Sequence, residues 1–276
     1  MPPSDDIGTT GRTGTVIITG ASGTLGTALL ARAPDGPRRL RAISRHPPSA
    51  ESGGGVDWYR ADLATGAGVD VALGGVQTII HAASDPGGDT QRTDVVGTRD
   101  LLAAAKRAGV QHFIYVSIVG IDRVPVAYYA HKLAAERLVE AGDVPFTILR
   151  CTQFFDYMDV LVRRMTRFPI ALVPRGFKSQ PIHVGEYADA LWESVAAGPH
   201  GRAPDVAGPE VLTLATMVQT WLTAHRRPVR LLQLPIPGRV AAAMRRGDAT
   251  APARAVGRMT WTTWLQQHAA RGQEHS

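Results

Sequence analysis

The stretch "TVIITGASGTLGTALL" (residues 15–30) decides the fold of this chain. A short apolar run precedes three glycines, Gly20, Gly23 and Gly26, and a helix-forming segment follows them. In a loop of this kind one glycine makes the tight turn, one lets the backbone approach a pyrophosphate, and one allows close packing of helix on strand. The free N–H groups at the start of the helix attract phosphates. The stretch therefore predicts a dinucleotide site, held by the loop and by Ser22, Thr24 and Leu25 within it.

Two other glycine-rich sites are excluded by the same residues. No lysine followed by serine or threonine closes the loop, so it is not the phosphate loop of nucleoside triphosphatases. The segment "GASGT" lacks the second glycine of G-x-S-x-G, so it is not the nucleophile turn of α/β-hydrolases.

Apolar runs of strand length alternate with helical segments over most of the chain, as in βαβ units around a parallel sheet. The fold class is therefore expected to be α/β. The expected strands are 15–19, 39–44, 56–62, 77–83, 112–117 and 146–150, and the expected helices are 24–33, 93–109 and 128–142. The expected organisation is a flexible N-terminal tail (1–13), a nucleotide-binding core (14–151), a substrate-side segment (152–181), a return to the core (182–198) and a C-terminal lobe (199–276).

The composition narrows the class of protein. Of 276 residues, 44% are hydrophobic and 20% charged, which is typical of globular domains. No run approaches the roughly 18 apolar residues of a membrane span, and no signal peptide is recognisable at the N-terminus, so we expect a cytoplasmic protein without a membrane partner. The net charge is +6, but the arginines are scattered, so no nucleic-acid partner is expected. We expect a monomer or homodimer that binds a small-molecule substrate.

The residues that bind metals or form disulfides are few. The single cysteine, Cys151, excludes an internal disulfide and a multi-cysteine metal site. No histidine or acidic cluster has metal-ligand spacing, so no metal is predicted.

The end of the second expected strand discriminates between nicotinamide cofactors. NAD sites usually hold an acidic residue about 20 residues beyond the glycine loop, on the ribose 2′-hydroxyl. Here Ser44 and Arg45 stand at that turn. A guanidinium pairs with a 2′-phosphate, so the sequence predicts NADP(H) rather than NAD(H).

Two further segments fit the same cofactor. Asp62, with Leu63, closes the third strand and is placed to accept a hydrogen bond from the adenine amino group, although a solvated loop acid would look the same. The small residues Ala82, Ala83 and Ser84 end the fourth strand, where bulk would block the ribose; the alternative is that they only pack.

Taken together, several segments resemble the short-chain dehydrogenase/reductase superfamily, in its atypical, NmrA-like branch of NAD(P)-binding proteins. They are "GASGTLG", "SR", "ADL", "IIHAAS", "DVVGTRDLLAAAKRAGV", "FIYVSIVG", "YYAHKLAAE" and "FTILRCTQFF". The resemblance implies a doubly wound parallel (Rossmann) sheet with a small C-terminal α/β substrate lobe.

The resemblance also implies a catalytic trio, Ser117, Tyr128 and Lys132. Tyr128 and Lys132 are four residues apart, so they share one helix face. Hydride delivery to a carbonyl leaves an oxyanion, and a tyrosine whose pKa is lowered by a nearby ammonium can protonate it. Ser117 would hydrogen-bond the carbonyl oxygen, and Lys132 would also hold the nicotinamide ribose. Without that chemistry, Tyr128 and Lys132 would be only the exposed first turns of a packing helix.

The substrate side is the least patterned part of the chain. Thr152, Gln153, Phe154 and Phe155 follow the sixth strand and are predicted to face the nicotinamide, with His183 at the pocket edge; the alternative for the aromatic pair is a core position. The expected function is an NADPH-dependent oxidoreductase that reduces a carbonyl or conjugated group, with Tyr128 as proton donor. Two alternatives stay open: a non-catalytic, redox-sensing regulator of NmrA-like type, and a cofactor-retaining isomerase or epimerase.

Overall fold

The computed structural model describes residues 14–35, 39–48 and 55–273. The predicted N-terminal tail, residues 1–13, lies outside them.

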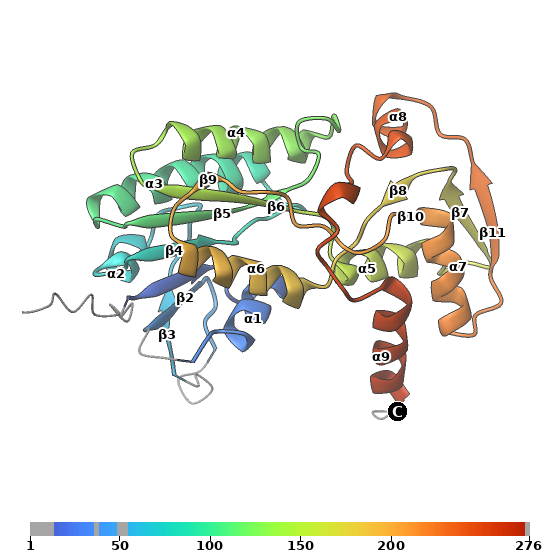
Figure 1. Ribbon diagram of the computed structural model, residues 1–276, viewed down its shortest axis with the longest axis horizontal. Helices are drawn as coiled ribbons and strands as arrows, with labels where there is room; N and C mark the ends of the chain where they lie inside the picture. The colour runs from blue at the N-terminus through green and yellow to red at the C-terminus, as the bar shows by residue number, and fades with distance from the viewer. Residues whose placement is uncertain (1–13, 36–38, 49–54, 274–276) are drawn as a thin grey trace, which may run out of the picture.

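A seven-stranded parallel sheet forms the centre of the larger part of the molecule (Figure 1). Its strands are β1 (Val16–Thr19), β2 (Leu40–Ser44), β3 (Val56–Arg60), β4 (Thr78–His81), β5 (His112–Ile118), β6 (Phe146–Cys151) and β9 (Gly201–Arg202). Their order is β3-β2-β1-β4-β5-β6-β9, so the chain changes direction between β1 and β4. Nucleotides bind at the carboxyl ends of the strands at such a switch point.

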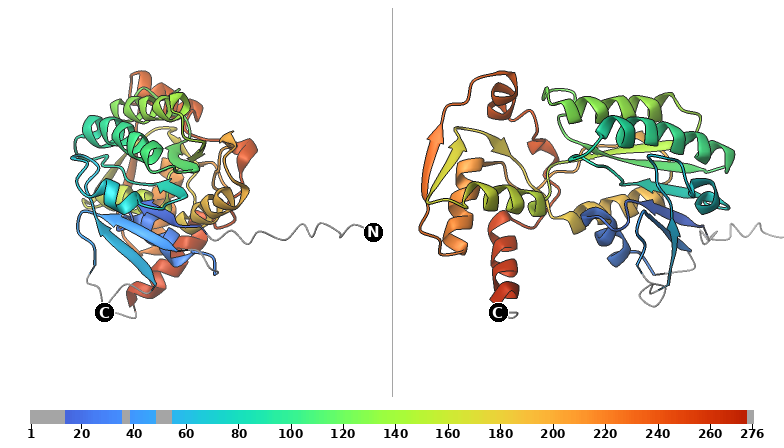
Figure 2. Two further views of the ribbon diagram at one scale, coloured as in Figure 1. Left: turned by 90° about the vertical axis from the view of Figure 1, so that its left-hand side faces the viewer. Right: turned by 180° about the vertical axis from the view of Figure 1, so that it is seen from behind.

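Helices cover both faces of this sheet (Figure 2). α1 (Thr24–Ala31) and α6 (Val184–Ala197) pack together on one face, where Trp192 donates a hydrogen bond to the Leu29 carbonyl. The other face carries α2 (Val69–Leu73), the π-helical turn η2 (Gln91–Val96), α3 (Gly97–Arg107) and α4 (Ala127–Ala141).

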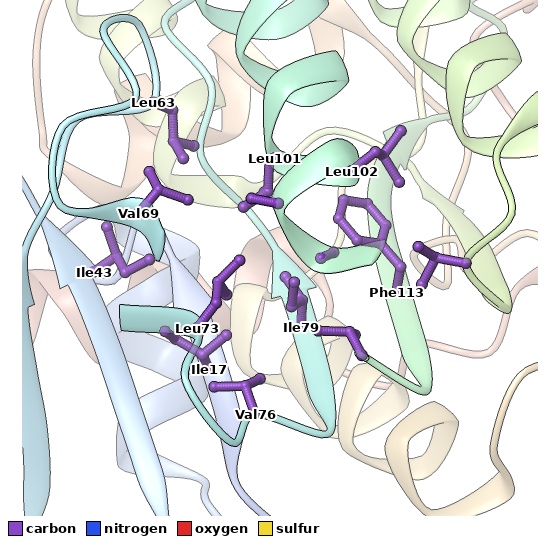
Figure 3. Packing of buried hydrophobic residues seen from close by; sticks show 14 of the residues in the cluster. Ile17, Ile43, Leu63, Val69, Leu73, Val76, Ile79, Leu101, Leu102 and Phe113 are labelled. Carbon is purple, nitrogen blue, oxygen red and sulfur yellow. The ribbon is translucent and has the colours of Figure 1, made fainter. Parts of the chain in front are cut away.

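The strands are apolar on both sides because both faces are covered. Ile17 and Ile79 of the two central strands are fully buried against Leu73 and Leu101 of the helices above them (Figure 3). Their neighbours Ile18 and Ile80 are equally buried on the opposite face. Burial of each such side chain stabilises the fold by roughly 1.5–3 kcal/mol.

A lobe beside the sheet has its own core, and it combines elements of the expected substrate-side segment with those of the expected C-terminal lobe (Figure 1). Its elements are α5 (Phe155–Met165), β7 (Ile170–Pro174), β8 (Lys178–Ser179), β10 (Leu212–Thr213), α7 (Leu214–Ala224), β11 (Arg230–Leu234), α8 (Arg239–Arg246), η3 (Pro252–Arg254) and α9 (Trp261–Gln273). β7 pairs with β11 in parallel and β8 with β10 antiparallel. Phe155 packs against Trp261 and Trp264, with ring centroids 5.7 and 5.8 Å away.

The predicted fold class is confirmed: the sheet is parallel and doubly wound, and a small α/β lobe follows it. Each expected strand is present, with ends that differ by up to two residues. The elements that were not predicted include α2, the short edge strand β9 and the π-helical turn η2, which begins the helix expected at 93–109. In the described part of the chain, every helix is too short or too polar to cross a bilayer.

Candidate functional site

The glycine loop joins β1 to α1 in a shape that side chains would not allow. Gly20 has φ +67°, and a Cβ there would lie 2.7 Å from the Cα of Ala83. A Cβ on Gly26 would overlap the Gly20 carbonyl oxygen. Gly23 begins α1 without a side-chain cap, so the first N–H groups of the helix stay available to a ligand. These features fit a bound pyrophosphate.

A cavity of about 300 Å³ opens in front of this loop. It lies at the carboxyl ends of the strands, beside the switch point. Ten of the predicted cofactor residues line it: Gly20, Ser22, Gly23, Ser44, Arg45, Asp62, Leu63, Ala82, Ala83 and Ser84. The other predicted loop residues, Thr24, Leu25 and Gly26, form the first turn of α1.

Short polar contacts fix the walls of the cavity. Ser22 and Ser44 share a hydrogen bond between their hydroxyls at 3.1 Å. The Asp62 carboxylate accepts the Ala64 N–H at 2.9 Å, so it closes its own turn while it lines the cavity. Asp62 therefore has a structural role, and contact with an adenine remains a prediction.

A second cavity, of about 420 Å³, adjoins the first and shares Arg45, His46, Ala61 and Asp62 with it. Arg60 also lines it, because Arg60 pairs with Ser44 across β2 and β3. Within the described ranges neither Arg45 nor Arg60 makes an ion pair. The second cavity thus carries two guanidinium groups and an imidazole against one carboxylate.

Tyr128 contacts Ser84, one of the residues that line the first cavity. Its hydroxyl is 2.8 Å from the Ser84 hydroxyl, which donates to the Asp94 carboxylate at 2.6 Å. A serine hydroxyl carries one proton, so Ser84 accepts its other hydrogen bond from Tyr128. Asp94 is 1% exposed, and η2 positions it.

Lys132 lies beneath these groups and is 3% exposed. Its ammonium donates to the Val116 carbonyl at 2.8 Å, lies 3.9 Å from the Asp94 carboxylate and stands 4.2 Å from the centre of the Tyr115 ring. Burial lowers the pKa of Lys132 to about 8, against the opposing charges of Asp94 and Glu136.

The pKa of Tyr128 is raised above its usual value, chiefly by burial. The hydrogen bond with Ser84 opposes that shift, whereas the charge of Asp94 adds to it. The phenol is therefore protonated at neutral pH. The lowering of its pKa that was expected from a nearby ammonium is not found in the free protein, because burial has the larger effect.

The structure does not bring Ser117 to Tyr128. Ser117 is fully buried, and it pairs with Arg150 across β5 and β6, so both side chains point to the same face of the sheet. There the Arg150 guanidinium makes two hydrogen bonds to Glu136, at 2.8 and 2.7 Å. Burial raises the pKa of Glu136, but the hydrogen bonds and the charge of Arg150 outweigh it, so the net shift is downward.

The predicted substrate-side residues have separate surroundings. Phe155 is fully buried in the lobe, which agrees with the alternative of a core position. Thr152 is also buried, and its hydroxyl accepts the Gly208 N–H at 3.2 Å. Gln153 donates a hydrogen bond to the Tyr129 hydroxyl at 3.2 Å, and Tyr129 is the chain neighbour of Tyr128. Of the predicted substrate-side residues, Gln153 is therefore the best placed to contact a substrate at Tyr128.

Phe154 and His183 lie further from this network. Phe154 packs against Tyr187 with ring centroids 5.9 Å apart. His183 precedes α6, and burial lowers its pKa. The charged groups near His183 include Glu186 and Arg32. Among the described residues, neither of these two contacts Tyr128, so His183 is not linked to the Tyr128 network.

Asp94 and Arg60 were not identified from the sequence as candidate site residues. Asp94 carried a signal, because it lies on the same helical stripe as Thr98, Leu101 and Leu102, and a carboxylate on an apolar face has to be paired. Arg60 carried none, since only strand pairing places it beside Ser44.

A family model described as NAD(P)H-binding matches residues 20–168. The chain belongs to this family. The match covers the glycine loop, both cavities and the Tyr128 network, so the predicted resemblance is confirmed.

Known proteins of similar sequence and structure agree with the family. A (4-alkanoyl-5-oxo-2,5-dihydrofuran-3-yl)methyl phosphate reductase of Streptomyces griseus is 26% identical over 79% of this chain and 77% of its own length. Three longer mycobacterial proteins match over 19% of their own length.

Solved structures show the same fold at low sequence identity. A nucleoside-diphosphate-sugar epimerase from Staphylococcus aureus has a TM-score of 0.73 at 17% identity, over 91% of this chain and 99% of its own. An NADPH-dependent quinone oxidoreductase from Escherichia coli, in complex with NADPH, has a TM-score of 0.70 at 20% identity, over 94% and 99%. The chain thus stands among NAD(P)-dependent reductases, dehydrogenases and epimerases, and it binds a nicotinamide cofactor.

Proposed function

We propose that this protein is an NADPH-dependent reductase that acts on a carbonyl or conjugated group of a small organic molecule, with Tyr128 as the proton donor. The observation that carries the proposal is the 2.8 Å contact between Tyr128 and Ser84, a residue in the wall of the nucleotide cavity. This contact supports the proposal that Tyr128 is a proton donor next to the cofactor site.

The residues present fit the cofactor along its length. The glycine loop would hold the pyrophosphate, and Ala82 and Ala83 leave room for a ribose. Arg45 and Arg60 would pair with a 2′-phosphate, which supports NADP(H) over NAD(H).

Bound NADPH would supply the hydride, and the protein would supply the proton. Reduction of a carbonyl leaves charge on its oxygen, and the Tyr128 hydroxyl would transfer its proton there. Lys132 and Asp94, a buried pair 3.9 Å apart, would keep the surroundings of the new phenolate close to neutral. The Streptomyces protein, which is named a reductase, and the Escherichia coli protein, which is named an NADPH-dependent quinone oxidoreductase, support this reaction class.

Oxidation of NADPH in the presence of ketones, enones and quinones tests the proposal. At least one class of compound should be reduced, and Tyr128→Phe should lower kcat/KM by about 100-fold, because general acid catalysis contributes roughly that factor or more. Tyr59→Phe is the matched control, since Tyr59 lies on β3 with its ring under Arg41. A panel without turnover, or an equally active Tyr128→Phe variant, would contradict the proposal.

A further inference from the structure

Ser84 and Ser117 lie at the carboxyl ends of two neighbouring strands, and of these two serines only Ser84 forms a hydrogen bond with Tyr128. Ser84 follows β4 and Ser117 ends β5. We propose that Ser84, and not Ser117, is the hydroxyl that works with Tyr128 in the reaction, and that Asp94 positions Ser84. The inference rests on the proposed reductase function.

Ser84 meets the geometric requirements of such a partner. Its hydroxyl is 2.8 Å from that of Tyr128, and it lines the cofactor cavity. The Asp94 carboxylate holds it at 2.6 Å, and the Asp85 N–H approaches the other carboxylate oxygen at 3.5 Å. A base or acid whose partner is itself oriented by a third group is the usual arrangement in enzyme sites.

Ser117 meets none of these requirements. Its side chain is completely enclosed, and it does not line the cofactor cavity. Its surroundings are the Arg150 and Glu136 ion pair, which also binds Arg202 at 3.1 Å. These contacts tie β6, β9 and α4 together. The Ser117 hydroxyl is enclosed beside them, and in the described part of the chain it has no hydrogen-bond partner.

Ser84 can serve both states of Tyr128 with one proton. Before the reaction Ser84 donates to Asp94 and accepts from the Tyr128 hydroxyl. In the reaction the Tyr128 proton moves to the substrate oxygen, the O–H bond of Tyr128 breaks, and its electron pair stays on the phenolate. The Ser84 hydroxyl then turns to donate to the phenolate, and water returns a proton to Tyr128 afterwards.

Parallel substitution of the two serines tests the inference. Ser84→Ala should lower kcat by about 30-fold or more, as loss of a hydrogen bond to a developing oxyanion does, with the Kd for NADPH measured separately. Ser84→Thr, which keeps the hydroxyl, should restore kcat to within about threefold. Ser117→Ala should leave kcat within about threefold of the wild type.

A measurement on the free protein, without cofactor or substrate, tests the hydrogen bond between Ser84 and Tyr128 independently of catalytic activity. The ¹³Cζ resonance of Tyr128 in the free, tyrosine-labelled protein, assigned from Tyr128→Phe, should move in Ser84→Ala and stay in place in Ser117→Ala. An unmoved resonance in Ser84→Ala, or loss of kcat in Ser117→Ala alone, overturns the inference although the protein is a reductase. A wild type that reduces nothing overturns the proposed function, and the resonance then still decides which serine bonds Tyr128.

Discussion

Arg60 is the residue whose proposed part in cofactor choice has no local sequence signal. It closes β3, and parallel pairing with Ser44 brings it to the cavity that Arg45 lines. Two guanidinium groups bind the dianionic 2′-phosphate of NADPH more tightly than one does. The second guanidinium adds no binding energy for the uncharged 2′-hydroxyl of NADH. Discrimination between NADPH and NADH should therefore depend on both arginines.

Substitution of Arg60 by glutamine should weaken NADPH binding by about tenfold, since a charge-assisted hydrogen bond contributes roughly 1.5 kcal/mol or more. NADH binding should stay within about twofold. Titration calorimetry of the wild type, Arg60→Gln and Arg45→Gln checks this, with exposed Arg137 of α4 changed to glutamine as the control. Equal loss of NADH affinity in Arg60→Gln would mean that Arg60 does not read the 2′-phosphate.

At the residue scale, the sequence predicted what depends on neighbours along the chain. The glycine spacing, Arg45 at the strand end and the four-residue interval from Tyr128 to Lys132 are all local. Ser117 was a different case, because the face to which a strand residue points depends on sheet register, and burial beside Glu136 is a tertiary property.

At the scale of elements, His81 joins β1, β4 and the helical layer beneath the site. Thr98 donates to the Asp94 carbonyl at 2.6 Å, so it accepts from the His81 Nε2–H at 2.9 Å. The His81 Nδ1 then accepts from Thr19 at 2.7 Å, and Thr19 accepts the Ala83 N–H at 3.2 Å. A neutral imidazole satisfies the whole chain of bonds, and it fixes η2 and hence Asp94.

Stability should fall in acid because of this histidine. Burial, with a smaller effect of Lys132, lowers the pKa of His81 from 6.5 to about 3. Between pH 6.5 and about 3, His81 is therefore protonated in the unfolded chain but neutral in the folded protein. The free energy of unfolding consequently decreases as the pH falls below 6.5. Between pH 7.5 and 5.0 the loss from His81 should be about 2 kcal/mol.

Urea unfolding of the wild type and His81→Asn at both pH values measures this effect. The difference in unfolding free energy between the two pH values should shrink by about 2 kcal/mol in the variant. An unchanged difference would show that His81 accepts a proton in the folded protein.

Elements with clear apolar periodicity were predicted, and short or irregular ones were not. α2 has five residues, fewer than periodicity can reveal, and η2 has π-helical bonding that no composition signals. The irregular turn matters most, since it carries Asp94.

At the scale of the molecule, the core and the lobe meet at the loop after β5. Gly120 has φ +83°, and a Cβ there would overlap the Asp248 carbonyl oxygen and lie 2.9 Å from the Cα of Ala249. Glu186 of α6 makes a second junction, where its carboxylate accepts the N–H groups of Arg258 and Met259 at 2.7 and 3.0 Å. The lobe is therefore fixed to the loop that leads from β5 to α4, the helix of Tyr128, and to the first turn of α6.

Gly120→Ala should lower the unfolding free energy by clearly more than Gly109→Ala. Gly109 also has positive φ, +70°, but no atom lies within 4 Å of an added Cβ, so it reports the backbone cost alone, about 1 kcal/mol. Thermal unfolding of both variants gives the comparison. Equal losses would show that the backbone contact with the lobe at Asp248 has no energetic weight.

The most direct test of the account follows the hydride itself. With NADPH deuterated at the transferred C4 position and a compound that the wild type reduces, mass spectrometry of the product reports where the deuterium goes. We predict one deuterium in the product for each NADPH consumed, with the rate lowered about 100-fold in Tyr128→Phe. A product without deuterium, product formation without net NADPH consumption, or an unchanged rate in Tyr128→Phe would contradict the account.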